Sequence, residues 1–491
     1  MTDRLTAGFL ALALLGPVGA AQAQTPSFAT TGFIESLALT TPGDPLSAGT
    51  MVVSNQPILL PRNLMVTMPG RYMTVQDLFR GPTGGAVGTA SGLALLDATP
   101  PKVPFEAEVI GNIANGQYVA GVVRISQGAL HAGAGFIQSI DAATGELRVG
   151  AHGRTDGARV RLNDETGIYG LRNGEGAKAA IVLDRRFALD PENSPIHAQT
   201  GFPVCVARPG GGDAACPAGN RPGGVVGLRF TCGPIPAAAD APPVPGCDPR
   251  RPAPLRVGDY VTYQGILVPD GANSFLIAAY ALAAELGIYT SPQAEPVYLA
   301  IEEAIQGTKG EAFGDIPQEE TTRFRIVGFT TDPSRKVEVR IVDSGRSPRD
   351  ASGNELGTSF TTGTGLSPSN GPQLGRFRNT WPAKDDARAV RRDVLALVVG
   401  SSYQSLPNGL ISGRYTAPMN EYIYPEPTSF GIRGFPVPVP FENFCFLQNG
   451  GGTMETDGGT VTLGRLDPFP DSGHPLSQPV GTGAARACDG Q

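Results

Sequence analysis

Histidine, tryptophan and charged residues are scarce in this chain, which has four His, one Trp and only 17% charged residues among 491. The balance of charge is acidic, with a formal net charge of -7 at pH 7. A protein that binds a nucleic-acid backbone or an anionic membrane surface needs a basic face. The composition therefore predicts that nucleic acid is not a partner.

Common metal-binding and catalytic motifs are also missing. The histidines are His131, His152, His197 and His474. None lies two or four residues from another, and H-E-x-x-H is absent, so each is interpreted as solvated or satisfied in a core. The chain lacks the G-x-S-x-G of serine hydrolases and the phosphate loop G-x-x-x-x-G-K-[ST]. Residues 174–179 match G-x-G-x-x-A, but Asn-Gly at the start indicates a turn. We predict no metal and no cofactor.

Long apolar runs are absent beyond the first two dozen residues. The nearest, Phe275–Leu286, is shorter than the roughly 18 residues that a membrane span requires. The N-terminus has Arg4, an apolar run over 5–15 and the small residues Ala21-Gln22-Ala23, as in secretory signals. We therefore expect 1–23 to be a signal peptide, the chain to have no transmembrane span, and the protein to be periplasmic or extracellular.

Six cysteines are present, an even number that favours disulfides in an exported chain. They are Cys205, Cys216, Cys232, Cys247, Cys445 and Cys488. Their spacings do not fit a zinc site. Short loops close at the least entropic cost, which favours pairing each cysteine with its neighbour in the sequence, although the first two pairs could instead cross.

The abundant turn residues, 66 Gly and 45 Pro, are spread among alternating apolar and polar runs. Alternation over 146–150 and 158–164 directs Leu147, Val149, Val160 and Leu162 to one side, as in half-buried antiparallel strands. Hairpins are predicted over 260–277 and over 323–342. The sequence therefore predicts a mainly β fold of several small antiparallel barrel or sandwich modules with few short helices.

Two segments are the best helical candidates. Pro296–Ile305 places Tyr298, Ile301 and Ile305 on one face, and a stretch around Asp385–Leu397 fits either a helix or the start of a strand.

The chain contains two short internal repeats, here called echoes. Gly32-Phe33-Ile34-Glu35-Ser36 recurs as Gly135-Phe136-Ile137-Gln138-Ser139, and Gly-Ile-Tyr occurs at 167–169 and again at 287–289. In strand pattern, 103–169 and 255–289 resemble small OB-type five-stranded barrels. That resemblance implies a fold used to bind oligosaccharides, oligonucleotides or peptides, although a fold alone does not define a function.

Segments rich in Gly, Pro or Cys separate the chain into predicted modules. The predicted divisions are a signal peptide (1–23), an N-terminal β module (24–100), a barrel-like module (101–204), a disulfide-stapled excursion (205–254), a second barrel-like module (255–342), a C-terminal β module (343–448), and a Gly/Pro-rich tail tied by Cys488 (449–491).

Tyrosines are the candidate ligand-binding residues, because an exposed ring can stack on a sugar while its hydroxyl reaches solvent. The candidates in one predicted module are Tyr260, Tyr263, Tyr280 and Tyr289. Alternation places the first two on opposite faces, which also fits ordinary packing.

No catalytic residue is assigned. Ser401-Ser402 follows an apolar run but is interpreted as a turn, and Asp350–Glu355 as a polar turn rather than a calcium loop. Adjacent carboxylates at 302–303, 319–320 and 385–386 do not face each other, as the two acids of a glycosidase must.

The sequence therefore predicts an exported, non-enzymatic protein that binds a ligand or forms surface or matrix structure. Carbohydrate or another cell-envelope component is the candidate partner. The alternative is a secreted hydrolase that acts on a polysaccharide or ester, with acidic residues assembled from distant strands.

Overall fold

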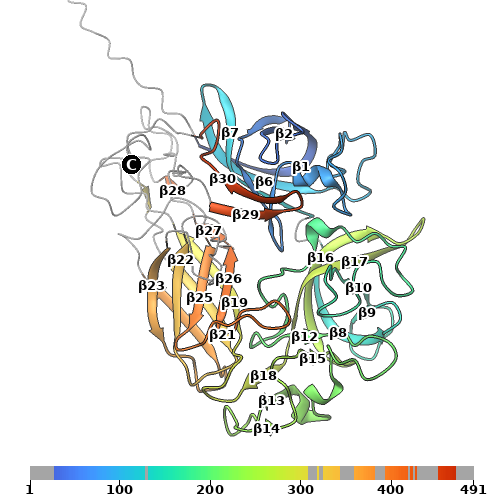
Figure 1. Ribbon diagram of the computed structural model, residues 1–491, viewed down its shortest axis with the longest axis vertical. Helices are drawn as coiled ribbons and strands as arrows, with labels where there is room; N and C mark the ends of the chain where they lie inside the picture. Colours follow the sequence, from blue (N-terminus) through green and yellow to red (C-terminus); the bar gives the residue numbers. More distant parts are fainter. Residues whose placement is uncertain are drawn as a thin grey trace, which may run out of the picture.

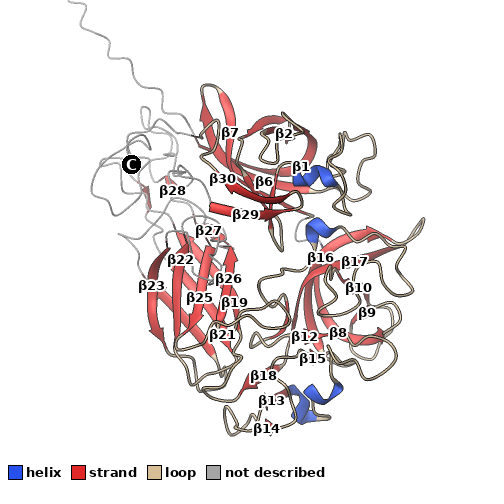
Figure 2. Cartoon of the chain, in the orientation of Figure 1, coloured by secondary structure: helices blue, strands red, loops and turns tan. Residues whose placement is uncertain are grey.

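The computed structural model describes residues 27–127, 131–307, 318–319, 324–342, 359–381, 393–418, 421–423, 426–427 and 452–470. Within these ranges the protein is mainly β, and its helices are single 3-10 turns of three or four residues (Figure 2). Two barrels, a two-sheet sandwich and a C-terminal hairpin make up the body (Figure 1). The predicted fold class of small barrel and sandwich modules is confirmed.

The first barrel has five strands in the order β3-β2-β1-β6-β7, closed by parallel pairing of β3 with β7. Its elements are β1 (Ser27–Leu39), β2 (Gly49–Val53), β3 (Gln56–Leu60), β6 (Glu106–Ala114) and β7 (Gln117–Ser126), with β4 (Met65–Thr67), β5 (Tyr72–Thr74) and η1 (Asp77–Arg80) in the crossover. Two-residue turns with positive φ at both positions join β2 to β3 and β6 to β7, as right-handed strand twist favours.

The second barrel repeats this order as β10-β9-β8-β16-β17, closed by parallel pairing of β10 with β17. Its strands are β8 (Ala132–Asp141), β9 (Glu146–Gly150), β10 (Ala158–Leu162), β16 (Tyr260–Pro269) and β17 (Phe275–Ala284). Each barrel is a five-stranded OB-like barrel. The predicted β16–β17 hairpin and the β9–β10 pair are confirmed, and all four apolar residues predicted to share a side are buried.

A glycine and a bulge recur at matching places in the two barrels. In the fourth strand the register shifts at Gly111 of β6 and at Gly265 of β16, each the sixth residue of its strand. A Cβ added there would lie 2.1 Å from the Val119 carbonyl oxygen in β6 and 2.5 Å from the Ala278 carbonyl oxygen in β16. Both positions therefore require glycine because backbone from the fifth strand approaches too closely for a side chain.

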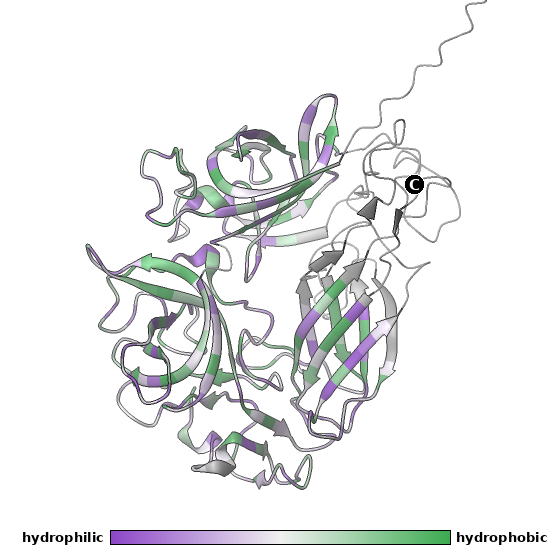
Figure 3. Ribbon diagram, turned by 180° about the vertical axis from the view of Figure 1, so that it is seen from behind, coloured by the Kyte–Doolittle hydropathy of each residue, from purple (hydrophilic) through white to green (hydrophobic). Residues whose placement is uncertain are grey.

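The third body is a sandwich of two four-stranded sheets, ordered β24-β21-β19-β27 and β23-β22-β25-β26. Its strands are β19 (Leu299–Gly307), β21 (Phe324–Thr330), β22 (Val337–Val342), β23 (Ser359–Leu366), β24 (Arg376–Trp381), β25 (Asp393–Val398), β26 (Arg414–Pro418) and β27 (Glu421–Ile423). Buried residues from both sheets, including Ile326, Phe377, Val339 and Ala396, form its core. Alternation of apolar and polar residues along these strands is visible in Figure 3.

Two sequence predictions fail in the sandwich. Pro296–Ile305 is not helical, because from Leu299 it is a strand paired with β21. A bulge between Ile301 and Glu303 adds one residue, so the side-chain spacing imitates that of a helix. The segments 324–330 and 337–342 are strands, but they do not form a hairpin. Instead, residues 331–336 carry the chain across to the opposite sheet.

The other helical candidate, around Asp385–Leu397, contains strand β25, and its residues up to 392 lie outside the described ranges.

The two barrels share a core. Leu183 and Phe187 from the crossover of the second barrel, with Ile266 and Leu276 from β16 and β17, belong to the hydrophobic cluster of the first. Phe187 stacks on Phe105 with ring centroids 5.0 Å apart.

Arg186 crosses the same junction and is 2% exposed. It pairs with Asp184 at 2.6 Å and donates hydrogen bonds to the carbonyl oxygens of Leu78 and Ser91 at 2.7 Å each. Arg186 lies within the 3-10 turn η3 (Arg185–Phe187), and the Asp184 side chain caps the N-terminus of this turn. The two barrels are therefore joined by the hydrogen bonds of Arg186 to Leu78 and Ser91 as well as by apolar packing, and the ion pair with Asp184 neutralises the buried guanidinium.

The crossover of the second barrel contains the Cys-rich excursion. Short elements run through it: β11 (Ile196–Ala198), β12 (Val204–Cys205), η4 (Ala218–Asn220), η5 (Val225–Leu228), β13 (Arg229–Cys232), β14 (Pro243–Val244) and β15 (Ala253–Pro254), with β18 (Gly287–Thr290) pairing to β13. Disulfides join Cys205 to Cys216 and Cys232 to Cys247, which confirms neighbour pairing for these four. Cys445 and Cys488 lie outside the described residues.

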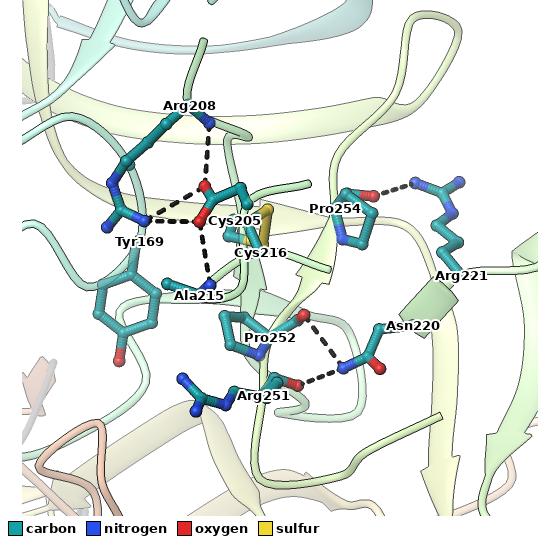
Figure 4. Close-up of a disulfide and its surroundings, with 12 residues drawn as sticks. Tyr169, Cys205, Arg208, Ala215, Cys216, Asn220, Arg221, Arg251, Pro252 and Pro254 are labelled. Carbon is teal, nitrogen blue, oxygen red and sulfur yellow. Dashed lines mark hydrogen bonds and ion pairs between the residues drawn. A yellow bond between two sulfur atoms is a disulfide. The ribbon is translucent and has the colours of Figure 1, made fainter. Parts of the chain in front are cut away.

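Side-chain bonds to backbone anchor the excursion around the Cys205–Cys216 disulfide (Figure 4). Asn220 donates to the carbonyl oxygens of Asp248 and Arg251, at 2.9 Å each. Arg221, only 4% exposed, forms an ion pair with Asp259 at 2.5 Å beside the start of β16. A segment rich in Gly and Pro is thus ordered by polar bonds and crosslinks.

The C-terminal segment returns to the first barrel. After the short β20 (Gln318–Glu319) and β28 (Glu426–Pro427) pair, β29 (Gly452–Thr456) and β30 (Gly459–Leu463) form a hairpin. Beyond it, Leu466 enters the core of the first barrel, and Asn112 donates to the Pro470 carbonyl oxygen at 2.7 Å. Asp457, at the hairpin turn, pairs with Arg185 at 2.9 Å.

Arg186→Met should destabilise the folded protein by about 3–5 kcal/mol, because it leaves Asp184 buried without its partner. The urea midpoint at pH 7 measures this. Arg154→Met is the control, because its ion pair with Asp156 is exposed, and it should shift the midpoint little. Equal midpoints for the two variants would contradict a stabilising role for the buried pair.

Replacing Cys232 and Cys247 together by Ser should cost about 2–4 kcal/mol, because the unfolded chain regains the entropy of a 15-residue loop. Non-reducing peptide mapping of the wild-type protein should recover linked 205–216 and 232–247 peptides. Recovery of crossed peptides would overturn this connectivity.

Candidate functional site

An aromatic cluster lies on the outside of the second barrel. Phe136 of β8 contacts Tyr260 of β16 and His152 of the β9–β10 loop, with centroids 5.2 and 5.1 Å apart. Both contacts are edge-to-face, at 76° and 84°, which is a favoured arrangement for aromatic pairs. Tyr260 is 36% exposed, and His152 is also exposed. We call Phe136, His152 and Tyr260 the aromatic platform.

Strand alternation and a bulge position the platform. Phe136 and Tyr260 are direct cross-strand partners, and the next residue, Ile137, points into the core with 1% exposure. A bulge between Ile137 and Ser139 directs Gln138 toward the β9–β10 loop. Gln138 donates to the Ala151 carbonyl oxygen and accepts from the Gly157 amide, both at 2.8 Å. The amide of Gln138 therefore holds the loop that carries His152.

The same loop contributes hydrogen-bonding groups. Arg154 and Asp156 pair at 2.5 Å, with side chains 65% and 63% exposed. Hydrogen bonding to Arg154 lowers the pKa of Asp156 below its ordinary value. An apolar ring surface on a loop with exposed donors and acceptors suits a ligand that has both an apolar face and hydroxyl groups.

The four predicted tyrosines are not brought together. Tyr260 belongs to the platform, whereas Tyr263 is 8% exposed and packs in the core of the second barrel. Tyr280 packs against the core of the first barrel. Tyr289 is 4% exposed and donates to the Leu374 carbonyl oxygen at 3.1 Å. Burial raises the pKa of Tyr263, Tyr280 and Tyr289.

Sequence reasoning missed the role of Phe136 and His152. The signal for Phe136 was present in the echo around residues 135–139. His152 gave no signal, because its contact depends on how a seven-residue loop folds back on the barrel.

The second and third strands form the face by which OB barrels often bind ligands. In the second barrel, arginine side chains on this face are bonded to other residues of the same chain. Arg159 of β10 pairs with Glu146 at 2.7 Å and also with Asp270 of the β16–β17 turn. Arg161, 2% exposed, donates to the carbonyl oxygens of Glu175 and Lys178. The G-x-G-x-x-A match over 174–179 thus presents carbonyl oxygens to an arginine, and it does not open a helix as a dinucleotide site requires.

Two carboxylates from distant parts of the chain, Asp77 and Asp457, lie close enough for their charges to interact. Burial, and then the charge of Asp457, raise the pKa of Asp77. Asp77 is 2% exposed, and the Asp457 side chain is 7% exposed and paired with Arg185. This pair is shielded from a substrate, unlike the acids of a glycosidase.

The adjacent carboxylates Glu302 and Glu303 take part in ion pairs. Glu302 pairs with Arg376 at 3.4 Å, and Glu303 pairs with Arg325. The 350–355 and 385–386 segments lie outside the described residues, as does Glu320.

Ser401 is part of a polar cluster between the second barrel and the sandwich. Its hydroxyl donates to Glu295 at 3.2 Å, and Arg335 pairs with the same carboxylate at 2.7 Å. Ser412 also donates to Glu295. Burial alone would raise the pKa of Glu295, but the bonds from Ser412 and Arg335 outweigh it and hold that pKa below its ordinary value. The cluster organises a junction and offers Ser401 no histidine base.

The histidines that the structure describes are dispersed. Burial lowers the pKa of His131 and of His197, and His197 Nδ1 lies 2.7 Å from the Ala198 carbonyl oxygen. Among the described residues, no group of three or more His, Cys, Asp or Glu side chains is arranged to hold a metal ion. His474 lies outside them.

Comparison of this chain with protein-family models and with curated proteins finds no match. In the part of the chain that the structure describes, no helix has the length and apolar character to cross a membrane.

Glu295→Gln should reduce the pH dependence of stability in acid. A folded pKa below the ordinary value near 4.5 means that Glu295 contributes its stability above that pH and loses it as pH falls through the lowered pKa. Melting temperatures from pH 7 to 3 should therefore fall less steeply in the variant, from a lower value at pH 7. Glu285→Gln, at an exposed position, is the control, and identical curves for Glu295→Gln and the wild type would contradict the role of the cluster.

Proposed function

We propose that this is an exported, non-enzymatic protein that binds carbohydrate of the cell envelope or extracellular matrix through the aromatic platform. The observation that carries the proposal is the edge-to-face arrangement of the half-buried Phe136 with the exposed Tyr260 and His152 on the wall of a closed barrel. Ring surfaces held by strands lose little conformational freedom on binding. They therefore suit the apolar faces of sugar rings, and the exposed Arg154 and Asp156 supply partners for hydroxyl groups.

Location and charge support this class of ligand. The two disulfides fit an oxidising compartment, and the N-terminal pattern fits secretion. The acidic net charge of -7 disfavours a polyanion such as nucleic acid, whereas a neutral polysaccharide carries no charge to repel.

The hydrolase alternative lacks a comparable observation. Among the described residues, carboxylates that come together from distant segments are buried or paired with arginine, as Asp77 with Asp457 and Glu146 with Asp270 illustrate. A general acid must reach the leaving-group oxygen of a bound substrate. We therefore favour binding without cleavage.

Phe136→Ala and Tyr260→Ala should each weaken retention on a bound polysaccharide about three- to tenfold, because each removes one stacking surface. The mature oxidised protein is first screened against soluble and insoluble polysaccharides and envelope fractions, with released sugars assayed in the same samples. Dissociation constants of the variants are then measured on the best binder.

Phe275→Ala is the matched control, because Phe275 is 38% exposed at the start of β17 in the same barrel and outside the platform. Its retention should equal that of the wild type. Release of sugars, or full retention by the Phe136→Ala/Tyr260→Ala double variant, would overturn the proposal.

A further inference from the structure

The first barrel has an exposed phenylalanine at the position that Phe136 occupies in the second. Phe33 lies in β1, the first strand of its barrel, and is 48% exposed. Phe136 lies in β8, the first strand of the other, and the two are the second residues of the echoed segments 32–36 and 135–139. In both cases the following isoleucine is buried, Ile34 at 0% and Ile137 at 1%.

Backbone pairing shows that this equivalence is structural. The register of β1 on β2 shifts between Ile34 and Ser36, and that of β8 on β9 shifts between Ile137 and Ser139. The Ile34 amide donates to the Phe105 carbonyl oxygen, one residue before β6. The Ile137 amide donates to the Asp259 carbonyl oxygen, one residue before β16. The two first strands therefore bend at the same residue and leave the fourth strand at the same point.

The side chain at the bulge, Glu35 or Gln138, makes an equivalent hydrogen bond in each barrel. Glu35 accepts from the Asn55 amide at 2.8 Å in the β2–β3 turn. Gln138 accepts from the Gly157 amide at 2.8 Å in the β9–β10 loop. Each therefore fixes the connection between the second and third strands beside the phenylalanine of its barrel, which is exposed in the first barrel and half-buried in the second.

The surroundings of the two rings differ in two respects. The cross-strand partner of Phe33 is Glu106, where Phe136 has Tyr260. The β2–β3 connection is the two-residue turn Ser54-Asn55, which is too short to fold a residue back as the longer loop does with His152. Phe33 thus keeps a stacking surface and gains a carboxylate acceptor in place of aromatic neighbours.

We propose that Phe33 is a second carbohydrate subsite, so that one polysaccharide chain engages both barrels. This inference rests on the proposed function and adds that the ligand is a polymer. A lone ring beside one carboxylate binds a short sugar weakly, but the second contact of a polymer is intramolecular and raises the overall affinity by avidity. The barrels are fixed to each other by their shared core, so the two rings keep a constant spacing.

The test compares the polysaccharide identified in the screen with a trisaccharide prepared from it. Phe33→Ala should weaken binding of the full-length polymer by roughly tenfold or more and change the trisaccharide dissociation constant less than about twofold. Phe136→Ala should weaken both. Phe33→Tyr should restore polymer binding because it keeps the ring, and Phe275→Ala is again the control. Circular dichroism melting checks that each variant is folded.

The outcomes separate the two proposals. If Phe136→Ala weakens polymer binding and a folded Phe33→Ala does not, the second subsite is refuted and the proposed function stands. If neither substitution alters binding, the proposed function itself fails. Equal loss of trisaccharide and polymer binding in Phe33→Ala would also refute a separate subsite, because it would place Phe33 within the first one.

Discussion

The buried guanidinium of Arg186 makes the interactions on which the relative orientation of the two barrels depends. A guanidinium is expensive to remove from water, and here its cost is offset because Asp184 and two carbonyl oxygens of the first barrel satisfy it. Arg186 can donate to the Leu78 and Ser91 carbonyl oxygens only when the crossover of the second barrel lies against the η1 region of the first barrel. Apolar packing brings the barrels together, and the directed bonds of Arg186 select one orientation.

Closure of each barrel sets where ligand-facing side chains can lie. A five-stranded barrel has a small interior that its own side chains fill, so a ligand can only be met outside. In the second barrel the second and third strands are engaged by the crossover, which leaves the first and fourth strands to present rings. The fourth-strand glycines permit the close approach of the fifth strand, and this tight closure makes the wall that holds Phe136 rigid.

The sequence was informative wherever a local pattern has a single structural meaning. Strand alternation at Leu147 and Val160, the β16–β17 hairpin and the pairing of Cys205 with Cys216 were predictable, because each depends on residues close in the chain. The predicted helix over 296–305 failed because a bulge changed the spacing, and the predicted hairpin over 323–342 failed because partner strands are chosen by long-range packing. Of the aromatic platform, Tyr260 was among the residues predicted from the sequence. Phe136 lies in the repeated segment 135–139, but the repeat could be interpreted only once the structure placed both copies in the first strands of the two barrels.

The return of the C-terminal segment to the first barrel has a consequence for the order of folding during synthesis. Leu466 fills the core that Ile34 and Val53 begin, although more than 400 residues separate them. The core of the first module to be synthesised is therefore complete only after the crossover residue Phe187 and then Leu466 have been made. Folding of the first barrel is thereby coupled to synthesis of nearly the whole chain, because one of its core residues is supplied last.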